Sequence, residues 1–305
     1  MKKNNLISVI INCRNSQKYI KETIDSVINQ TYKNFEIIIV NNNSTDNTKN
    51  IIFSYSDQRI KYFELNKSIS LGAARNIALK ESSGEFIAFI DSDDIWDKSK
   101  IEQTLKEFQN NIGLVYSDVV YFNSEKSFNL YKGRKAYEGN CFSSLLIDYN
   151  LCISSCVISR KYMNKFLFDE NLNVCEDLDF FLKISYKSKL KYVPKTLVKY
   201  RIHGSNLSIT NQHMFYEEFK IVLKNLQQKF NIENKLIIKM EDINYINYAK
   251  FFWKNRKIKE SFTELKKIKT LHLKALVYKL IIFVPYRFVN KIYRIISPVK
   301  IELTN

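Results

Sequence analysis

The sequence predicts an α/β protein whose mostly parallel sheet carries helices on both faces. Within the first 122 residues, short runs rich in Ile and Val alternate with stretches that have the spacing of a helix. The runs are apolar throughout, which is typical of parallel strands buried on both faces. With 305 residues, of which 45% are hydrophobic, the chain is long enough for one large core and an additional region.

The first two strands are expected at residues 6–12, "LISVIIN", and 35–41, "FEIIIVN", because β-branched residues favour buried strands. Between them, residues 16–30 place Ile and Val at helical spacing and predict a helix. The polar stretch 42–48 predicts a turn that contains a cap for the next helix. The candidates for this cap are Ser44 and Thr45.

The alternation continues with strands expected at 59–65, 85–90 and 113–122, and helices at 70–83 and 99–109. Polar residues follow three of the predicted strands. They are Asn12-Cys13-Arg14, Asn41-Asn42-Asn43 and Asp91-Ser92-Asp93. Ligands of open α/β sheets bind beyond the carboxyl ends of the strands, so we expect these ends to meet in one crevice.

The second half of the chain is less regular. Residues 152–163 predict a strand that enters a short helix, 175–188 an amphipathic helix, and 190–203 a loosely alternating strand. From residue 211 the pattern is helical and basic. We therefore expect a first domain at 1–210 and a basic helical region at 211–305.

The net charge of +17 is concentrated near the C-terminus. Residues 211–305 hold 19 basic and 8 acidic side chains. Such an excess favours an anionic membrane surface or a nucleic acid as partner, and a solvated basic tail is the alternative. No nucleic-acid partner is expected, because no recognition motif accompanies the charge.

The five cysteines are odd in number and form no CxxC pair, so reduced thiols are expected. The apolar stretch near the N-terminus is too short for a signal peptide. Both observations predict a cytoplasmic location.

An acidic stretch follows the strand predicted at 85–90. Its carboxylates, Asp91, Asp93 and Asp94, repel one another, so they form a solvated loop or bind a cation. Hard oxygen ligands of this kind suit Mg²⁺ or Mn²⁺, which in turn bind phosphates.

Four segments, in this order, resemble the inverting family-2 glycosyltransferases of the GT-A fold over roughly residues 6–210. The segments are "SVIINCRNSQKYIKETIDSVINQTYKNFEIIIVNNNSTDNT", "GAARNIALKESSGEFIAFIDSDDIW", "NVCEDLDFFLKIS" and "VKYRIHGSNLS". The resemblance implies a GT-A fold and transfer of a sugar from a nucleotide-sugar donor.

The resemblance also implies Mn²⁺ or Mg²⁺ at the acidic stretch. Asp93 would bind the metal directly, Asp91 would face the nucleotide ribose or the water shell of the metal, and His203 would complete the metal site. Asp94 would support the ligands or be solvated. For His203, a purely structural role is the alternative.

Asp177 is, by the same resemblance, the catalytic base that takes the proton of the acceptor hydroxyl. The alternative is that Glu176 and Asp177 only suit the positive end of a helix.

The resemblance places the nucleotide sugar near six residues. They are Cys13, Arg14, Asn41, Arg75, Asp91 and Ser92. The family often has Asp where Asn41 stands, and an Asn carbonyl accepts the hydrogen bond of uracil without charge. UDP is the expected nucleotide. Arg14 would stack on the base or contact phosphate. Arg75 would contact phosphate, or be an exposed helix cation.

Residues 255–300 mix basic, aromatic and aliphatic side chains. Their longest run without charge, Leu280–Tyr286, is too short to span a bilayer, which takes about 20 residues. These residues predict interfacial helices on an anionic membrane surface, or a helical cap on the catalytic domain.

The expected function is transfer of a sugar to a glycan or lipid-linked saccharide of a surface polysaccharide, on the inner face of the cytoplasmic membrane. One alternative is the same enzyme with a soluble acceptor. The other is an inactive GT-A-like protein that binds membrane or nucleic acid.

Overall fold

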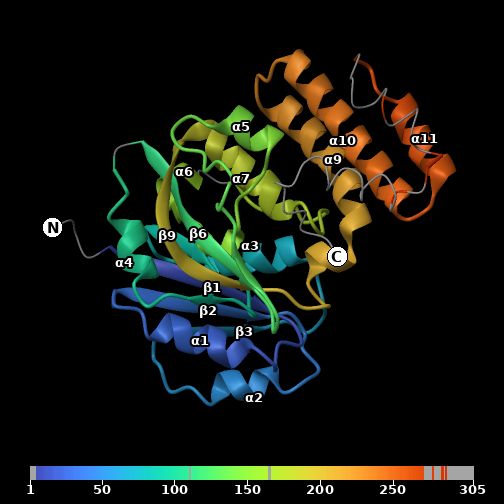
Figure 1. Ribbon diagram of the computed structural model, residues 1–305. Coiled ribbons are helices and arrows are strands. Elements are labelled where there is room, and N and C mark those ends of the chain that lie inside the picture. The colour runs from blue at the N-terminus through green and yellow to red at the C-terminus, as the bar shows by residue number, and fades with distance from the viewer. Residues whose placement is uncertain are drawn as a thin grey trace. The chain divides into compact units, whose positions relative to one another are not determined.

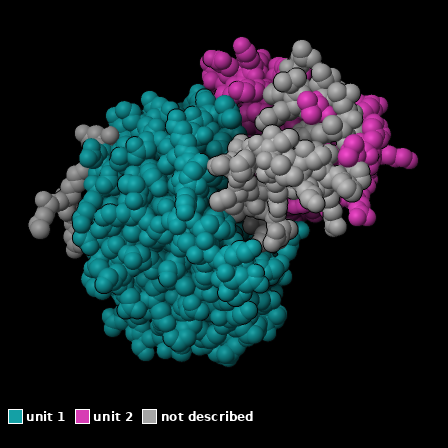
Figure 2. Space-filling model, viewed as in Figure 1, with its two compact units in different colours: residues 1–210 teal, residues 211–305 magenta. Residues whose placement is uncertain are grey.

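The computed structural model describes residues 5–109, 111–163 and 166–270, and the single positions 277, 283, 284 and 286. The chain divides into two compact units, residues 1–210 and residues 211–305 (Figure 2).

The first unit is built on a mixed sheet. Its strands within the described residues are β1 (Ile7–Cys13), β2 (Phe35–Asn41), β3 (Ile60–Glu64), β4 (Phe86–Phe89), β5 (Ile95–Trp96), β6 (Ile112–Phe122), β7 (Ser127–Asn129), β8 (Val157–Ser159) and β9 (Lys189–Arg201). They follow the order β3-β2-β1-β4-β8-β6-β9-β5, and β7 pairs with β6.

The strands β3, β2, β1 and β4 are parallel, as the apolar runs predict. In the middle of this half, Ile7 pairs with Phe35 on one side and Phe86 on the other. All seven residues of β2 are buried. The carboxyl ends of β1, β2 and β4 therefore lie at one edge of the sheet.

The other half of the sheet is mixed. Strand β8 runs antiparallel to both β4 and β6, and β5 runs antiparallel to β9, whereas β6 and β9 are parallel. The expected parallel direction of the strands thus holds throughout the first half, whereas the second half also contains antiparallel pairs. Apolar runs report burial, and burial is the same for either direction of pairing.

Helices cover both faces of the sheet (Figure 1). Helices α1 (Ile20–Ile28) and α2 (Thr48–Phe53) lie on one side, and α3 (Leu71–Glu81) and α7 (Glu176–Lys187) lie on the other. The shorter helices of this unit are α4 (Lys100–Leu105), α5 (Phe142–Ile147), the 3₁₀ helix η1 (Ile153–Ser155), α6 (Arg160–Met163) and α8 (Leu207–Thr210).

Helix α1 begins four residues later than predicted. The backbone N–H of Ser16 donates to Thr48 Oγ1, and that of Gln17 donates to Asp46, which holds this segment as a loop. The two predicted caps of α2 are wrong. Asp46 Oδ1 accepts from the N–H of Thr48, while Ser44 and Thr45 both bond Asn15 in the loop after β1.

The second unit contains α9 (Gln212–Lys229), α10 (Asn234–Lys254) and α11 (Ile258–Lys266), which confirms its helical character. Ile246, Ala249, Trp253 and Leu265 form a small core. Asp242 accepts hydrogen bonds from the N–H groups of residues 269 and 270 and so closes the segment after α11.

Of the predicted interfacial segment 255–300, residues 271–276, 278–282, 285 and 287–300 lie outside the described residues. Among the residues that are described, no helix has the length and apolar character needed to cross a membrane.

Candidate active site

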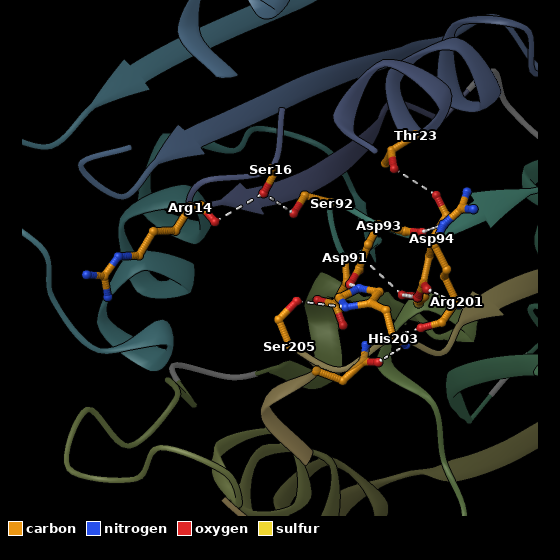
Figure 3. A network of polar contacts seen from close by, with 12 residues as sticks. Arg14, Ser16, Thr23, Asp91, Ser92, Asp93, Asp94, Arg201, His203 and Ser205 are labelled. Carbon is orange, nitrogen blue, oxygen red and sulfur yellow. Dashed lines mark hydrogen bonds and ion pairs between the residues drawn. The ribbon is translucent and has the colours of Figure 1, made fainter. Parts of the chain in front are cut away.

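The loop after β4 brings the acidic stretch against the end of β9 (Figure 3). Asp93 Oδ2 lies 2.8 Å from Nε2 of His203, and the hydroxyl of Ser205 lies 2.9 Å from Nδ1 of the same ring. The ring of Tyr19 stacks on that of His203 with a centroid distance of 5.0 Å. Two residues predicted as metal ligands, 110 positions apart in the chain, therefore meet in space.

Asp94 is the residue after Asp93 and is fully buried. Its Oδ2 accepts from the hydroxyl of Ser154 at 2.5 Å, and its Oδ1 accepts from the backbone N–H of Arg201 at 3.0 Å. Burial and the charges of Asp91 and Asp93 raise the pKa of Asp94 well above its usual range. Asp94 is therefore not solvated, and the expectation that it supports the ligands agrees with its position.

Burial and the negative charge of Asp91 also raise the pKa of Asp93, while His203 opposes the shift. Burial is the larger of the two causes, and a cation beside Asp93 would favour its charged form. An added cation would stabilise the turn.

Arg75 joins the acidic stretch to the start of α7. Its guanidinium donates to Asp91 Oδ1 at 3.0 Å and to Glu176 Oε1 at 2.7 Å, and it lies 5.4 Å from the ring of Phe168. Arg75 is 3% exposed, so the alternative of an exposed helix cation is wrong. A buried guanidinium between two carboxylates fixes the distance between the two acidic groups.

Asp177 stands half-buried in the first turn of α7. Its Oδ1 accepts from the N–H of Leu178 at 2.6 Å, and the hydroxyl of Tyr149 donates to Oδ2 at 3.3 Å. Burial and the charge of Glu176 raise the pKa of Asp177 to about 7, with Arg75 opposing. A carboxyl group with such a pKa can accept and release a proton near neutral pH.

Two of the predicted nucleotide contacts have side chains that face into the protein. The amide of Asn41 donates to the hydroxyl of Tyr62 at 2.9 Å and accepts from the N–H of Ser44 at 3.1 Å, and Asn41 is fully buried. The thiol of Cys13 donates to the carbonyl of Val40, and burial raises its pKa to about 12.

The other predicted contacts are divided. Asp91 and Arg75 bond each other, and the hydroxyl of Ser92 lies 2.7 Å from that of Ser16. Arg14 is exposed, and its guanidinium points away from the acidic stretch (Figure 3).

Sequence reasoning missed four residues of this site: Tyr19, Tyr149, Ser154 and Arg201. Each acts through a contact with a residue at least 28 positions away. Tyr19 and Arg201 lie inside quoted motifs, but nothing local in the sequence shows what they touch.

The donor set of the turn fits a divalent ion that also binds phosphate. Among the residues described, no three His, Cys, Asp or Glu side chains are grouped as metal ligands. Mg²⁺ commonly binds through one or two carboxylates together with substrate phosphates, which does not require such a group. Asp93 and Asp91 supply carboxylate oxygens of the kind that these ions prefer, and the ring of His203 lies against Asp93.

Comparisons with known proteins agree with the fold and with the motifs. The family model described as "Glycosyl transferase family 2" matches residues 8–168. An uncharacterized glycosyltransferase of Rickettsia bellii is 32% identical over 212 residues, which cover 68% of this chain and 30% of that protein. The chain spans 30–36% of the length of this protein and of two other Rickettsia relatives.

The Escherichia coli enzyme WfgD, named UDP-Glc:alpha-D-GlcNAc-diphosphoundecaprenol beta-1,3-glucosyltransferase, is 31% identical over 67% of this chain and 79% of its own length. Among solved structures, S. aureus TarS 1–349 in complex with UDP-GlcNAc matches with a TM-score of 0.70 and 19% identity, over 98% of this chain and 94% of that chain.

The mannosyltransferase PcManGT from Pyrobaculum calidifontis, in complex with GDP-Man and Mn²⁺, matches with a TM-score of 0.61 and 14% identity, over 93% of this chain and 83% of that chain. At such identities the structural matches speak for the fold. Together with the match of the family model to more than half of the chain, they show that the chain belongs to glycosyl transferase family 2 and has the GT-A fold.

Proposed function

We propose that the chain is a metal-dependent, inverting glycosyltransferase that moves a sugar from a nucleotide sugar, with UDP as the nucleotide, to a glycan or lipid-linked saccharide. The observation that carries the proposal is a pair of contacts at neighbouring residues: His203 meets Asp93, and Arg75 bonds both Asp91, two residues before Asp93, and Glu176, which precedes Asp177. It joins a pair suited to a cation with a carboxyl group suited to a proton.

Inversion requires a base on the face of the sugar opposite the leaving nucleotide. Asp177 is the proposed base, since its raised pKa lets it take the proton of the acceptor hydroxyl. Tyr149 orients one carboxylate oxygen and the N–H of Leu178 the other. Arg75 holds Glu176, and thereby the start of α7, beside Asp91.

Asp93 and His203, with Asp91 close by, are the residues that would hold Mn²⁺ or Mg²⁺. When bound, the ion would neutralise the charge that develops on the leaving diphosphate. PcManGT was solved with GDP-Man and Mn²⁺, which supports this part of the proposal. The family match ends at residue 168, so the roles of Asp177 and His203 rest on their geometry and on the resemblance of their motifs.

The names of two relatives support the proposed substrates. TarS was solved with UDP-GlcNAc, and WfgD is named for UDP-Glc and a diphosphoundecaprenol acceptor. For this chain we propose a UDP-sugar donor and a lipid-linked acceptor. The contact of Asn41 with uracil stays a prediction. In the structure the amide of Asn41 bonds Tyr62 and Ser44.

We further propose that residues 1–210 are the catalytic domain and that the basic region 211–305 rests on an anionic membrane surface. The charge of residues 211–305 supports this. Removing residues 271–305 should abolish binding to vesicles that contain anionic lipid and leave donor hydrolysis largely intact. Unchanged binding of the shortened chain would contradict the assignment of the membrane contact to the tail.

The catalytic proposal is tested by a screen of donors: UDP-glucose, UDP-galactose, UDP-N-acetylhexosamines, GDP-mannose and dTDP-rhamnose, each with Mn²⁺ and with EDTA. We expect metal-dependent hydrolysis of at least one UDP-sugar. Failure to hydrolyse or transfer any of them would favour an inactive basic binding protein.

A further inference from the structure

The buried carboxylate of Asp94 connects three segments that are distant in the sequence. Ser154 of η1 and Arg201 at the end of β9 bond its two carboxylate oxygens. The hydroxyl of Thr23 in α1 donates to its backbone carbonyl at 2.8 Å. Asp94 itself lies between β4 and β5, so one residue links the segment after β4 to the end of β9.

Ser154 uses its hydroxyl for two contacts with the acidic turn. The hydroxyl donates to Asp94 and accepts from the backbone N–H of Asp91 at 3.0 Å. A serine hydroxyl has a single hydrogen to donate, so both contacts together fix its orientation. The carbonyl of Ser154 accepts from the indole N–H of Trp96 at 2.8 Å, which fixes η1 against the far end of the same turn.

Arg201 contacts the turn through backbone and side chain. Its N–H donates to Asp94 Oδ1, and its Nε donates to the carbonyl of Asp93 at 3.0 Å. Its guanidinium also pairs with Glu22 and lies 4.5 Å from the ring of Tyr19. His203 follows two residues later on the same segment. The contacts of Arg201 therefore set the position of His203 relative to Asp93.

We propose that Asp94, Ser154 and Arg201 are positioning residues that hold Asp93 and His203 in register for binding a divalent cation together with the nucleotide diphosphate. The inference rests on the proposed function, because it assigns these residues to its metal site. The physical reason is that ligand groups must be held to within about 0.5 Å and that outer partners do this holding. Loss of such a partner typically lowers metal affinity about 10- to 100-fold.

The test compares two adjacent serines. Ser154→Ala and Ser155→Ala each remove one buried hydroxyl from η1, but the contacts of the Ser155 hydroxyl are with the carbonyl of Cys152 and the thiol of Cys156 and not with the turn. Binding of Mn²⁺ in the presence of UDP is measured by calorimetry, beside thermal unfolding and the pH dependence of kcat.

We expect Ser154→Ala to weaken Mn²⁺ binding about 10- to 100-fold, with a matching rise in KM for the donor. The apparent pKa that governs kcat should stay unchanged, because Asp177 keeps its neighbours. Ser155→Ala should bind Mn²⁺ as the wild type does. Ser154→Thr, which keeps the hydroxyl, should restore part of the affinity.

Equal Mn²⁺ affinities of Ser154→Ala and the wild type would overturn the inference and leave the proposed function standing. Equal losses in Ser154→Ala and Ser155→Ala would also overturn it, since the effect would then be one of folding. A wild-type chain that binds UDP without any dependence on Mn²⁺ would overturn the proposed metal site itself. If Ser154→Ala does not fold, Arg201→Lys, which keeps the backbone N–H but loses the Nε contact, provides the same comparison at the other partner.

Discussion

The molecule carries two acidic clusters that differ in how firmly their carboxylates are held. At the turn after β4, Asp93 is paired with His203, and Asp94 is fully buried against Ser154 and Arg201. At the start of α7, Asp177 is half-buried and accepts hydrogen bonds from the hydroxyl of Tyr149 and the N–H of Leu178.

The difference suits the two roles proposed above, a cation site at the turn and a proton site at α7. In both clusters burial and neighbouring carboxylates raise the pKa of an aspartate. The turn holds its carboxylates in a fixed geometry, as a cation requires. At α7 the carboxyl group of Asp177 has a pKa of about 7, as a base requires. Arg75 bonds both clusters and fixes the spacing between them.

The largest effect is expected for Asp177→Asn. The amide keeps the shape but accepts no proton, so the transfer rate should fall about 10²- to 10⁴-fold. Binding of UDP and Mn²⁺, measured by calorimetry, should stay near the wild-type value. Asp148→Asn is the matched control, because Asp148 directly precedes Tyr149 and its carboxylate is half-exposed. Normal turnover of Asp177→Asn would refute its role as the base.

Arg75→Gln should uncouple the two clusters. It leaves Glu176 buried without its cation, so the free energy of unfolding should fall by about 3–5 kcal/mol. Because Arg75 lowers the pKa of Asp177, the acid limb of the rate profile should move to higher pH. Arg160→Gln is the control, since that guanidinium donates to Gly84 and Ser82 and not to a carboxylate. An unchanged acid limb would mean that the clusters are not coupled electrostatically.

Asp93→Ala should fail in binding where Asp177→Asn fails in rate. Loss of a ligand should weaken Mn²⁺-supported UDP binding by at least the roughly 10- to 100-fold known for the loss of an outer partner. Titrations of UDP with and without Mn²⁺ measure this. Asp97→Ala is the control. It removes a carboxylate from the same stretch, one that accepts hydrogen bonds from Ser99, and it should leave Mn²⁺-supported UDP binding unchanged. If UDP binding by Asp93→Ala depends on Mn²⁺ as strongly as it does in the wild type, Asp93 is not a metal ligand and the turn has a structural role.

The pH profile tests the proton site alone. Only the ionised form of Asp177 accepts a proton, and its pKa is about 7. Below that pH the rate should fall about tenfold per pH unit, and above it the rate should level off. The affinity for UDP should not show this fall below pH 7. A flat rate between pH 5 and 8 would show that another group, or another step, limits the reaction.

The smallest effect is expected for Asn41→Asp. The side chain faces Tyr62 and Ser44, so the added charge should change UDP affinity less than a charged hydrogen bond to uracil would, which is worth about 1.5–3 kcal/mol. Asn50→Asp, which makes the same change on the surface of α2, is the control. A tenfold increase of UDP affinity in Asn41→Asp, without such an increase in the control, would show that Asn41 contacts uracil.

The amino-acid sequence was sufficient to predict the α/β class, the buried parallel strands and the acidic stretch at a strand end. These features are local, since a strand is marked by its own apolar run and a strand end by the polar residues that follow. The order of the four motifs predicted the family, which the comparisons confirm.

The folded structure was needed to establish which groups around the acidic stretch are buried and what they touch. Asp94 and Arg75 have ionisable side chains that are fully or almost fully buried, and their partners lie up to 107 positions away in the chain. A buried charge is stable only where such partners converge, and convergence is a property of packing. The same holds for the antiparallel strand β8, since an apolar run records that it is buried and not the direction in which its neighbours run.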